Sequence, residues 1–203
     1  TMAEEYQNKT FSEAGAFPDT CEKRVFRQCK FQSVDLTDRV FERCVFESCK
    51  FFACRMGASV FRRCRMTNCV FELCSLFDTA FDSCKMTGSV FYEIDCTCFS
   101  ITGGDWSFTD VRELDFYKMK LCGVNFDHAD FTGCCLDQAV FQDCNLSHIK
   151  VGNTSAVGTD FRSSTMDGID FRGIQMKKTK IDLTQAILIA SCMGAECIYK
   201  GDL

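Results

Sequence analysis

The sequence has very little proline, histidine and tryptophan: one proline, two histidines and one tryptophan in 203 residues. No apolar run approaches the roughly 18 residues that a transmembrane helix needs, which excludes a membrane-spanning helix. No N-terminal run of basic, then apolar, then small residues marks a secretory signal. A strong positive charge is also missing, because 28 acidic side chains outnumber 23 basic ones. That balance disfavours direct binding of nucleic acid.

Cysteine, by contrast, is abundant, with 17 residues. A disulfide framework is typical of short secreted chains, and this chain is neither short nor visibly secreted. Two interpretations remain at this point. The cysteines could ligate a metal, or they could serve as small apolar core residues. Their spacing along the chain distinguishes the two.

A period of five residues runs through most of the chain. Every fifth residue from Phe26 to Ile181 is apolar, which gives 32 consecutive positions that we call centres. Fifteen of the 21 phenylalanines are centres, and only the centres Cys96 and Ala156 are small. The residue two before each centre, here called the small position, is cysteine at ten places. Seven of the 13 glycines fall two after a centre, here called the turn position.

Neither a helix nor a half-buried strand has this period. Two inward residues in every five require the chain to turn a corner after each unit. Four corners close a square coil of 20 residues, and stacked coils pair as parallel strands. The centres then fill the axis of a rod, as exemplified by the predicted core residues Phe46, Phe71, Phe91, Phe126 and Phe141.

The repeated unit resembles the pentapeptide-repeat family, in which a small residue is followed by any residue and then by leucine or phenylalanine. Matching units are CVFES at residues 44–48, ADFTG at 129–133 and CNLSH at 144–148. The resemblance implies an all-β fold, the right-handed quadrilateral β-helix. We expect an N-terminal segment or cap over residues 1–23, a β-helix of about eight coils over 24–183, and a C-terminal helix and dimerisation cap over 184–203. Residues 92–115 keep the phase but lose the motif, which predicts a local bulge or distorted corner.

The cysteines and histidines fit this rod without a metal or a catalytic site. Cysteines at the small positions would stack as free thiols in a packed interior, which predicts a reducing compartment, the cytoplasm. His128 and His148 lie one coil apart and should be surface neighbours. No cysteine or histidine spacing matches a zinc site, and a regular rod has no cleft for a catalytic group. We therefore predict no metal, no cofactor and no enzymatic activity.

Acidic residues gather in the middle of the chain. Residues 78–143 hold 12 acids and four bases, whereas residues 21–74 hold 11 bases and six acids. Folding the coil in four assigns Asp78, Asp95, Asp115 and Asp137 to one face. A solvated face that keeps the rod soluble would explain them. Alternatively, the acids imitate DNA phosphates and bind a basic groove on a protein. The predicted partner-binding residues on this acidic face are Asp78, Asp95, Asp105, Asp110, Glu113, Asp115 and Asp137.

The period stops after Ile181, and a short helix is predicted from Thr184 to Gly194. Thr184 or Asp182 is the expected N-cap and Gly194 the expected C-cap. The helix is apolar nearly all round, so one side can cover the last coil while the other needs a partner. A homodimer closes such an assembly economically, although a monomeric cap is the alternative. The predicted dimerisation residues are Ile187, Leu188, Ala190, Ser191 and Met193, and residues 195–199 could add a final strand.

A rod without long loops that ends in this helix resembles the topoisomerase-interacting branch of the family, the quinolone-resistance (Qnr) proteins and their loop-free mycobacterial relatives. The resemblance implies a homodimeric DNA mimic that binds DNA gyrase and topoisomerase IV, both type II topoisomerases, and protects against fluoroquinolones or other gyrase poisons. The alternatives are a structural scaffold rod with another protein partner, or an enzyme or metal protein that uses the cysteines and histidines.

Overall fold

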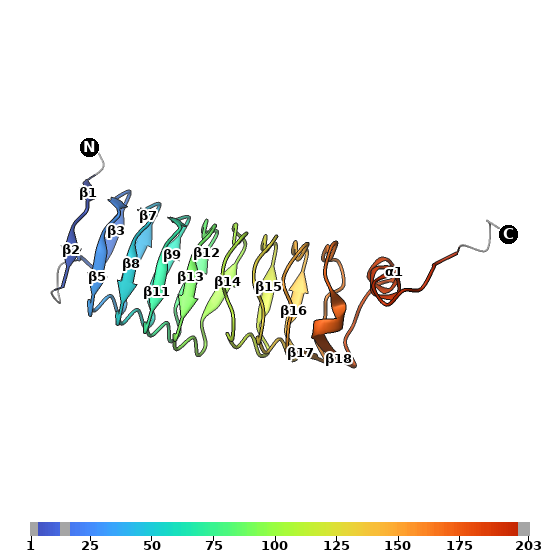
Figure 1. Cartoon of the computed structure of the whole chain (residues 1–203). Helices are drawn as coiled ribbons and strands as arrows, with labels where there is room; N and C mark the ends of the chain where they lie inside the picture. The colour runs from blue at the N-terminus through green and yellow to red at the C-terminus, as the bar shows by residue number, and fades with distance from the viewer. Residues whose placement is uncertain (1–3, 13–16, 199–203) are drawn as a thin grey trace.

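The computed structural model describes residues 4–12 and 17–198. The chain winds into a β-solenoid of four-sided coils, and the coils stack along one axis (Figure 1). Every pairing joins a residue to the one 20 positions further on, as Phe51 to Phe71 and Phe71 to Phe91. About eight coils form the rod. The predicted quadrilateral β-helix is confirmed, and the register of 20 follows from four units of five residues.

The four faces of the coil carry the strands in a fixed order around the axis. Face 1 holds β1 (Glu5–Gln7), β4 (Val25–Arg27), β7 (Val45–Glu47) and β10 (Arg65–Thr67). Face 2 holds β2 (Thr10–Phe11), β5 (Lys30–Gln32), β8 (Lys50–Phe52), β11 (Val70–Glu72) and β13 (Val90–Tyr92). Face 3 is joined by single bridges from Asp35 to Asp95 and again from Asp115 to Ser155, and it ends with β17 (Thr154–Val157) and β18 (Ile174–Lys177). Face 4 holds β3 (Thr20–Glu22), β6 (Val40–Glu42), β9 (Val60–Arg62), β12 (Ala80–Asp82), β14 (Ser100–Thr102), β15 (Lys120–Cys122) and β16 (Val140–Gln142).

The stack begins before the start expected at residue 24. β1 pairs with β4, β2 with β5, and β3 with β6, so the N-terminal segment contributes strands of its own. Tyr6 stacks on Phe26 with ring centroids 5.2 Å apart, which extends the column of centres by one coil. Arg24 and Arg39 sit at small positions near this end, and each pairs with an acid 20 residues earlier, Glu4 and Asp19.

The core is a set of columns of stacked rings. On face 2, Phe31, Phe51, Phe71 and Phe91 stack with centroid separations of 4.5 to 4.8 Å and nearly parallel planes. This separation matches the ~4.8 Å between hydrogen-bonded strands, so one spacing satisfies the backbone ladder and the ring contacts together. The five predicted core phenylalanines are all buried.

The buried cysteines do more than fill space. The Cys49 thiol donates to the carbonyl of Phe26 at 3.3 Å, and the Cys69 thiol donates to the carbonyl of Phe46 at the same distance. Serine and threonine make the same bond at other small positions, as from Thr79 to Met56 at 2.7 Å. Burial raises the pKa of the Cys134 thiol, which keeps the proton that this bond requires. All 17 cysteines are free thiols.

The turn positions explain where glycine occurs. Nearly all of them have a positive φ, for example +53° at Arg43 and +63° at Gly123. The left-handed region costs a residue with a Cβ roughly 1–2 kcal/mol, so glycine is favoured there. The coil imposes this conformation once in every unit.

The stretch that was predicted to be irregular, residues 92–115, keeps the register of 20 but loses part of the hydrogen-bonded ladder between its two coils. Within the described chain, no backbone hydrogen bond joins residues 93–98 to residues 112–117. Large side chains occupy the small positions of both coils at this point: Ile94, Phe99, Leu114 and Met119. They are too long for a position that elsewhere holds cysteine, serine or threonine, and they hold the coils apart. Phe99 is buried and packs edge-on to Phe116, beside the small centre Cys96.

The same rule applies a second time along the rod. Ile149 and Ile169 are large residues stacked at small positions, and no backbone hydrogen bond joins 149–153 to 169–173 among the residues the structure describes. A single large residue between small neighbours does not break the ladder, because the Asn145 N–H still reaches the carbonyl of Val124 at 3.0 Å. Two large residues in succession therefore open the ladder.

A short 3-10 helix, η1 (Phe171–Gly173), and helix α1 (Leu183–Cys192) complete the fold. α1 lies at the C-terminal end of the stack (Figure 1). Asp182 is its N-cap and forms a capping box with Gln185, and Gly194 follows its end with a φ of +89°. The Gln185 amide is buried and donates to the carbonyls of Phe161 and Ser164, which closes the last coil. No described helix is long and apolar enough to cross a membrane.

The predicted final strand is not formed, since residues 195–198 have no regular structure and Tyr199 lies outside the described residues. The polypeptide here follows α1 away from the stack, so it has no coil edge beside it to pair with.

Replacing Phe71 by alanine should lower the free energy of unfolding by ~3–5 kcal/mol, because its ring is fully buried between Phe51 and Phe91. Urea unfolding followed by circular dichroism measures the change. Phe77→Ala is the control, because Phe77 is half exposed and should cost under ~1 kcal/mol. Equal losses for the two variants would show that Phe71 is not an axial residue.

Replacing Leu114 by cysteine should restore the ladder on face 3, because a thiol fits the small position that leucine overfills. The Asp115 N–H should then bond to the carbonyl of Ile94, and its exchange with solvent deuterium should slow by at least about tenfold. Val124→Cys is the control, since its ladder is intact and its neighbours' exchange should not change. Unaltered exchange at Asp115 would contradict the steric explanation.

Candidate functional site: the acidic middle of the rod

The seven predicted partner-binding residues lie on three faces rather than one. Asp95 and Asp115 occupy equivalent places on face 3, and Asp78 and Asp137 belong to turns of the same face. Asp110 lies on face 2, and Glu113 lies at the corner between faces 2 and 3. Asp105 lies on face 1, where it bridges to Lys85 and Asn125. The register of 20 therefore brings Asp95, Glu113 and Asp115 together at the corner of faces 2 and 3, and the other four acids lie elsewhere on the three faces.

Several of these carboxylates accept hydrogen bonds from backbone N–H groups, either in their own turn or, for Asp137, in the next coil. Asp95 accepts hydrogen bonds from the Thr97 hydroxyl at 2.7 Å and the Thr97 N–H at 3.1 Å, which lower the pKa of Asp95. Asp115 accepts from the N–H of Tyr117 at 2.8 Å. Asp137 accepts from the N–H of Val157 at 2.8 Å. The sequence pattern did not reveal this structural role, although an aspartate two residues before a turn N–H is its usual signal.

Asp105 and Asp110 are already neutralised by neighbours. Asp105 accepts from the amide of Asn125 at 3.0 Å and lies 3.6 Å from the Lys85 ammonium. Asp110 receives the Arg112 guanidinium in two bonds, of 2.8 Å to one oxygen and 2.7 Å to the other. Burial acts to raise the pKa of Asp110, but the Arg112 bonds outweigh it, and the net pKa is lowered. These two acids offer less free charge than the sequence suggests.

Four acids around the corner of faces 2 and 3 have no basic partner within the described residues: Glu93, Asp95, Glu113 and Asp115. Glu93 was not among the predicted binding residues. Glu93 lies at a turn position, directly before the large residue Ile94 at a small position. An acid next to an irregular unit is the feature of the sequence that could have identified it. We call the set formed by these four residues the corner acids.

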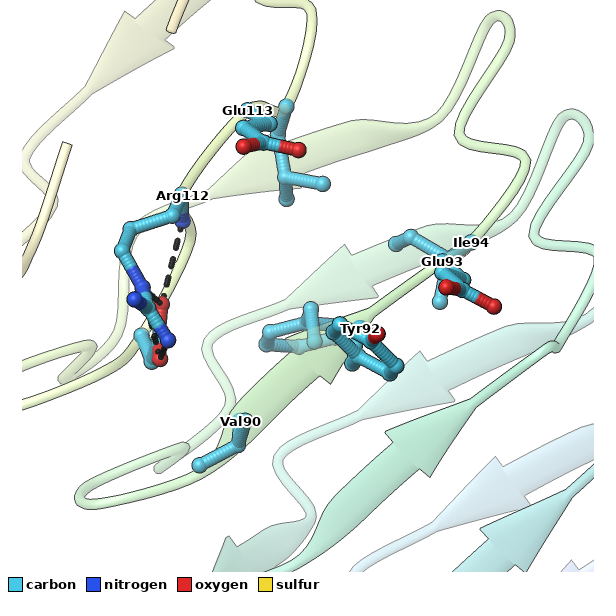
Figure 2. A pocket seen from close by; sticks show the side chains of 9 residues that line it. Val90, Tyr92, Glu93, Ile94, Arg112 and Glu113 are labelled. Atoms are coloured by element: carbon cyan, nitrogen blue, oxygen red, sulfur yellow. Dashed lines mark hydrogen bonds and ion pairs between the residues drawn. The ribbon is translucent and has the colours of Figure 1, made fainter. Parts of the chain in front are cut away.

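The corner acids surround an opening between two coils. Figure 2 shows Glu93 and Ile94 on one coil and Glu113 and Arg112 on the next, with Tyr92 beside them. A cavity of about 430 Å³ lies on the face 2 side of the corner, and a second of about 480 Å³ lies on the face 3 side. The second cavity has an apolar lining of Ile94, Cys96, Phe99, Leu114 and Met119. The predicted absence of a cleft is therefore wrong here, because the large residues at the small positions part the coils.

The two histidines are neighbours, as the sequence predicted. Their ring centroids are 4.5 Å apart and their planes differ by 25°. Both Nδ1 atoms point to the same oxygen of Asp127, at 3.0 Å from His128 and 2.9 Å from His148. These three side chains could offer ligand atoms to one metal ion. A metal lies in the plane of each imidazole that binds it, so near-parallel stacked rings favour the shared carboxylate over chelation.

Helix α1 uses part of its apolar surface to cover the stack. Leu188, Ile189 and Cys192 pack against the core, so Leu188 is less available to a partner than predicted. Ser191 and Met193 are exposed, and Ile187 and Ala190 are half-buried. Leu183 is 84% exposed and extends the apolar surface, although it was not among the predicted dimerisation residues.

Residues 107–138 and 139–177 match the family model "Pentapeptide repeats". The same 20-residue register continues to the N-terminal end of the described stack. The chain contains pentapeptide repeats over residues 107–138 and 139–177. This family model describes a structural repeat, and the absence of enzymatic activity stays a prediction.

The fold of this pentapeptide-repeat chain is similar to those of several solved structures. HetL, a pentapeptide-repeat protein involved in heterocyst differentiation regulation from the cyanobacterium Nostoc sp. strain PCC 7120, superposes with a TM-score of 0.73 at 11% identity, covering 87% of this chain and 88% of HetL. Full-length QnrB1, a plasmid-mediated fluoroquinolone resistance protein, gives a TM-score of 0.57 at 16% identity, covering 94% of this chain and 100% of QnrB1. No curated protein matches the sequence. At these identities the likeness concerns the fold alone.

Proposed function

We propose that this chain is a rod-shaped binding protein whose partner is a type II topoisomerase, DNA gyrase, and whose acids take the place of DNA phosphates. The observation that carries the proposal is the set of corner acids without basic partners, on a rod of the same fold as QnrB1. A DNA-binding groove offers lysine and arginine to phosphates, and an acidic rod with carboxylates on successive coils can occupy the same groove. The rod itself does not bind nucleic acid in this proposal.

Binding would protect gyrase from fluoroquinolones and other poisons, or inhibit it. The protein acts without a cofactor, as a homodimer joined through α1. The cytoplasm is the compartment that suits it, because thiols remain reduced there and the buried cysteines donate hydrogen bonds only as thiols.

A second function is a scaffold that binds a different protein partner. The specific observation in its favour is the better superposition on HetL, whose TM-score of 0.73 exceeds the 0.57 of QnrB1. Asp95 and Asp115 are also used in local turns, and Asp137 in a contact with the next coil, which leaves less charge free for imitation of DNA. A pull-down from bacterial lysate that returns no topoisomerase subunit would favour the scaffold.

The decisive experiment is a gyrase supercoiling assay with purified protein titrated in, with and without ciprofloxacin. We expect inhibition of supercoiling, or rescue from the drug, at stoichiometric to tenfold excess protein. Replacing Asp95, Asp115 and Asp137 together by asparagine should weaken the effect by about tenfold or more. Asparagine keeps the side-chain oxygen that accepts each backbone N–H, so the variant removes charge and leaves these hydrogen bonds in place.

The control removes three charges elsewhere: Asp35→Asn, Asp38→Asn and Asp143→Asn in one variant. It should retain the full effect on gyrase, because these acids lie outside the acidic corner. If the wild-type protein neither inhibits nor rescues gyrase, the proposed function is wrong. If both triple variants lose activity equally, net charge rather than this surface is responsible.

Dimerisation through α1 is tested by Met193→Asp. Met193 is 57% exposed, so the change should leave the fold intact and convert the dimer to a monomer in analytical ultracentrifugation, since a buried unpaired carboxylate opposes the interface. Thr184→Asp adds the same charge to an exposed place in the first turn of α1, where an acid favours the helix, and should remain dimeric. Wild-type protein that sediments as a monomer at a concentration of about 100 µM would refute the homodimer, because a specific dimer has a lower dissociation constant than this.

A further inference from the structure

The opening between the coils at residues 92–99 and 112–119 has the size of a site for one partner side chain. Its two cavities, of about 430 and 480 Å³, meet at the corner of faces 2 and 3. Pockets of this size accommodate small ligands or protruding side chains. The opening is produced by the large residues at the small positions, so it belongs to the sequence and not to the general fold.

The walls of this cleft carry backbone groups that the fold normally pairs. In an intact coil, each such carbonyl accepts a hydrogen bond from a backbone N–H of the preceding coil. Arg62 occupies the place equivalent to Arg112, and its carbonyl accepts from the Arg43 N–H at 2.9 Å. The equivalent bonds to the carbonyls of Arg112, Asp115 and Tyr117 are missing within the described chain. Carbonyls left without a ladder partner in the wall of the cleft are free to accept a hydrogen bond from an incoming donor.

The charge at the cleft is negative and uncompensated. Glu93 and Glu113 stand on successive coils at its mouth, as Figure 2 shows, and neither has a basic partner among the described residues. Asp95 and Asp115 add two more carboxylates on the face 3 side. The nearest bases are already engaged, because Arg112 is held by Asp110 and the Lys118 ammonium lies 4.7 Å from the centre of the Tyr117 ring. The cleft therefore suits a cation.

Exposed apolar side chains gather around the same corner. Leu73, Phe77, Tyr92 and Tyr117 are each between 46% and 54% exposed, and they lie on the two coils of the cleft or on the coil before it. Solvent-exposed aromatic rings next to unpaired charge are typical of protein interaction sites. Because a ring face also attracts a guanidinium, Tyr92 and Tyr117 add to the preference for a cationic side chain.

We propose that this cleft receives an arginine side chain from a protein partner, flanked in the partner by apolar residues that contact the exposed rings. Arginine fits better than lysine, because its planar guanidinium has five donors for the carboxylates and the free carbonyls and can stack on tyrosine. Its charge is complementary to the corner acids, and its long stem matches the apolar lining of Ile94, Leu114 and Met119. The identification of that partner as gyrase rests on the proposed function, but the arginine site does not.

A peptide titration tests the site without any assumption about the partner. The probe is the peptide acetyl-Gly-Leu-Arg-Leu-Gly-amide, added to the full-length 15N-labelled protein and followed by amide chemical shifts. We expect saturable shifts confined to residues 92–99 and 112–119. The lysine peptide should bind several-fold more weakly, and the citrulline peptide, which has the same shape without the charge, at least about tenfold more weakly. Shifts spread along the rod, or equal binding of the citrulline peptide, would overturn the proposal.

Two pairs of variants separate the cleft from general acidity. Glu93→Gln with Glu113→Gln should weaken the arginine peptide by about tenfold. Glu22→Gln with Glu42→Gln is the matched control, because these glutamates are also 20 residues apart but lie on face 4 of intact coils, and it should bind as the wild type does. Equal weakening in both pairs would overturn the proposal.

The variant Leu114→Cys keeps every charge and should reduce binding if the cleft itself is required. The exchange rate of the Asp115 amide is measured on the same variant, because slowed exchange shows that the ladder between the two coils has formed. Unchanged peptide binding in a variant whose ladder has closed would also overturn the proposal. A protein that binds the arginine peptide in the cleft but leaves gyrase unaffected would preserve the arginine site and remove the topoisomerase as its partner.

Discussion

The whole structure depends on the match between two distances. Parallel strands that share hydrogen bonds lie ~4.8 Å apart, and the phenylalanine rings stacked along face 2 lie 4.5 to 4.8 Å apart. A coil that returns after 20 residues satisfies both at once, so a phenylalanine column and a backbone ladder stabilise the same register. The small position completes the arrangement, since its thiol or hydroxyl reaches the carbonyl of the coil before. Where the small position holds cysteine, serine or threonine in an intact ladder, a unit thus bonds to its neighbour through the backbone, the core and a side-chain donor.

Much of this could be predicted from the sequence, because a strict period of five leaves few alternatives. Phe46, Phe71 and Phe126 have their place in the core from phase alone, and the proximity of His128 and His148 follows from their separation of 20. The fold-level comparisons and the family match agree with that interpretation. The cysteines show the limit of the same reasoning. Their phase predicted that they are buried, but not that each thiol donates a hydrogen bond, because that depends on the direction of a carbonyl in another coil.

The acidic site was harder to predict for a similar reason. Charge counts along the chain located the acids, but they could not tell which carboxylates are used by a neighbour. Asp137 accepts a hydrogen bond from the next coil, Asp110 is bound by Arg112, and only the surroundings distinguish them from Glu93. The cleft depends on two pairs of large residues in successive coils, Ile94 with Leu114 and Phe99 with Met119. The sequence marks these positions as irregular, yet whether the coils close or part depends on how the whole side chains pack.

The two interruptions of the ladder also bear on how the rod gains and loses its structure. A solenoid in which each coil contacts only its neighbours behaves as a one-dimensional chain of coupled units, and the coupling between units sets how far order spreads. Where the coupling is weak, order in one segment is transmitted poorly to the next. The coils before residue 93, the coils between the two interruptions, and the last coil with its helix are then three segments joined by weaker junctions. Force applied along the axis, or a partner that binds one segment, would concentrate strain in the rod at those junctions. The phenylalanine columns within each segment would stay intact.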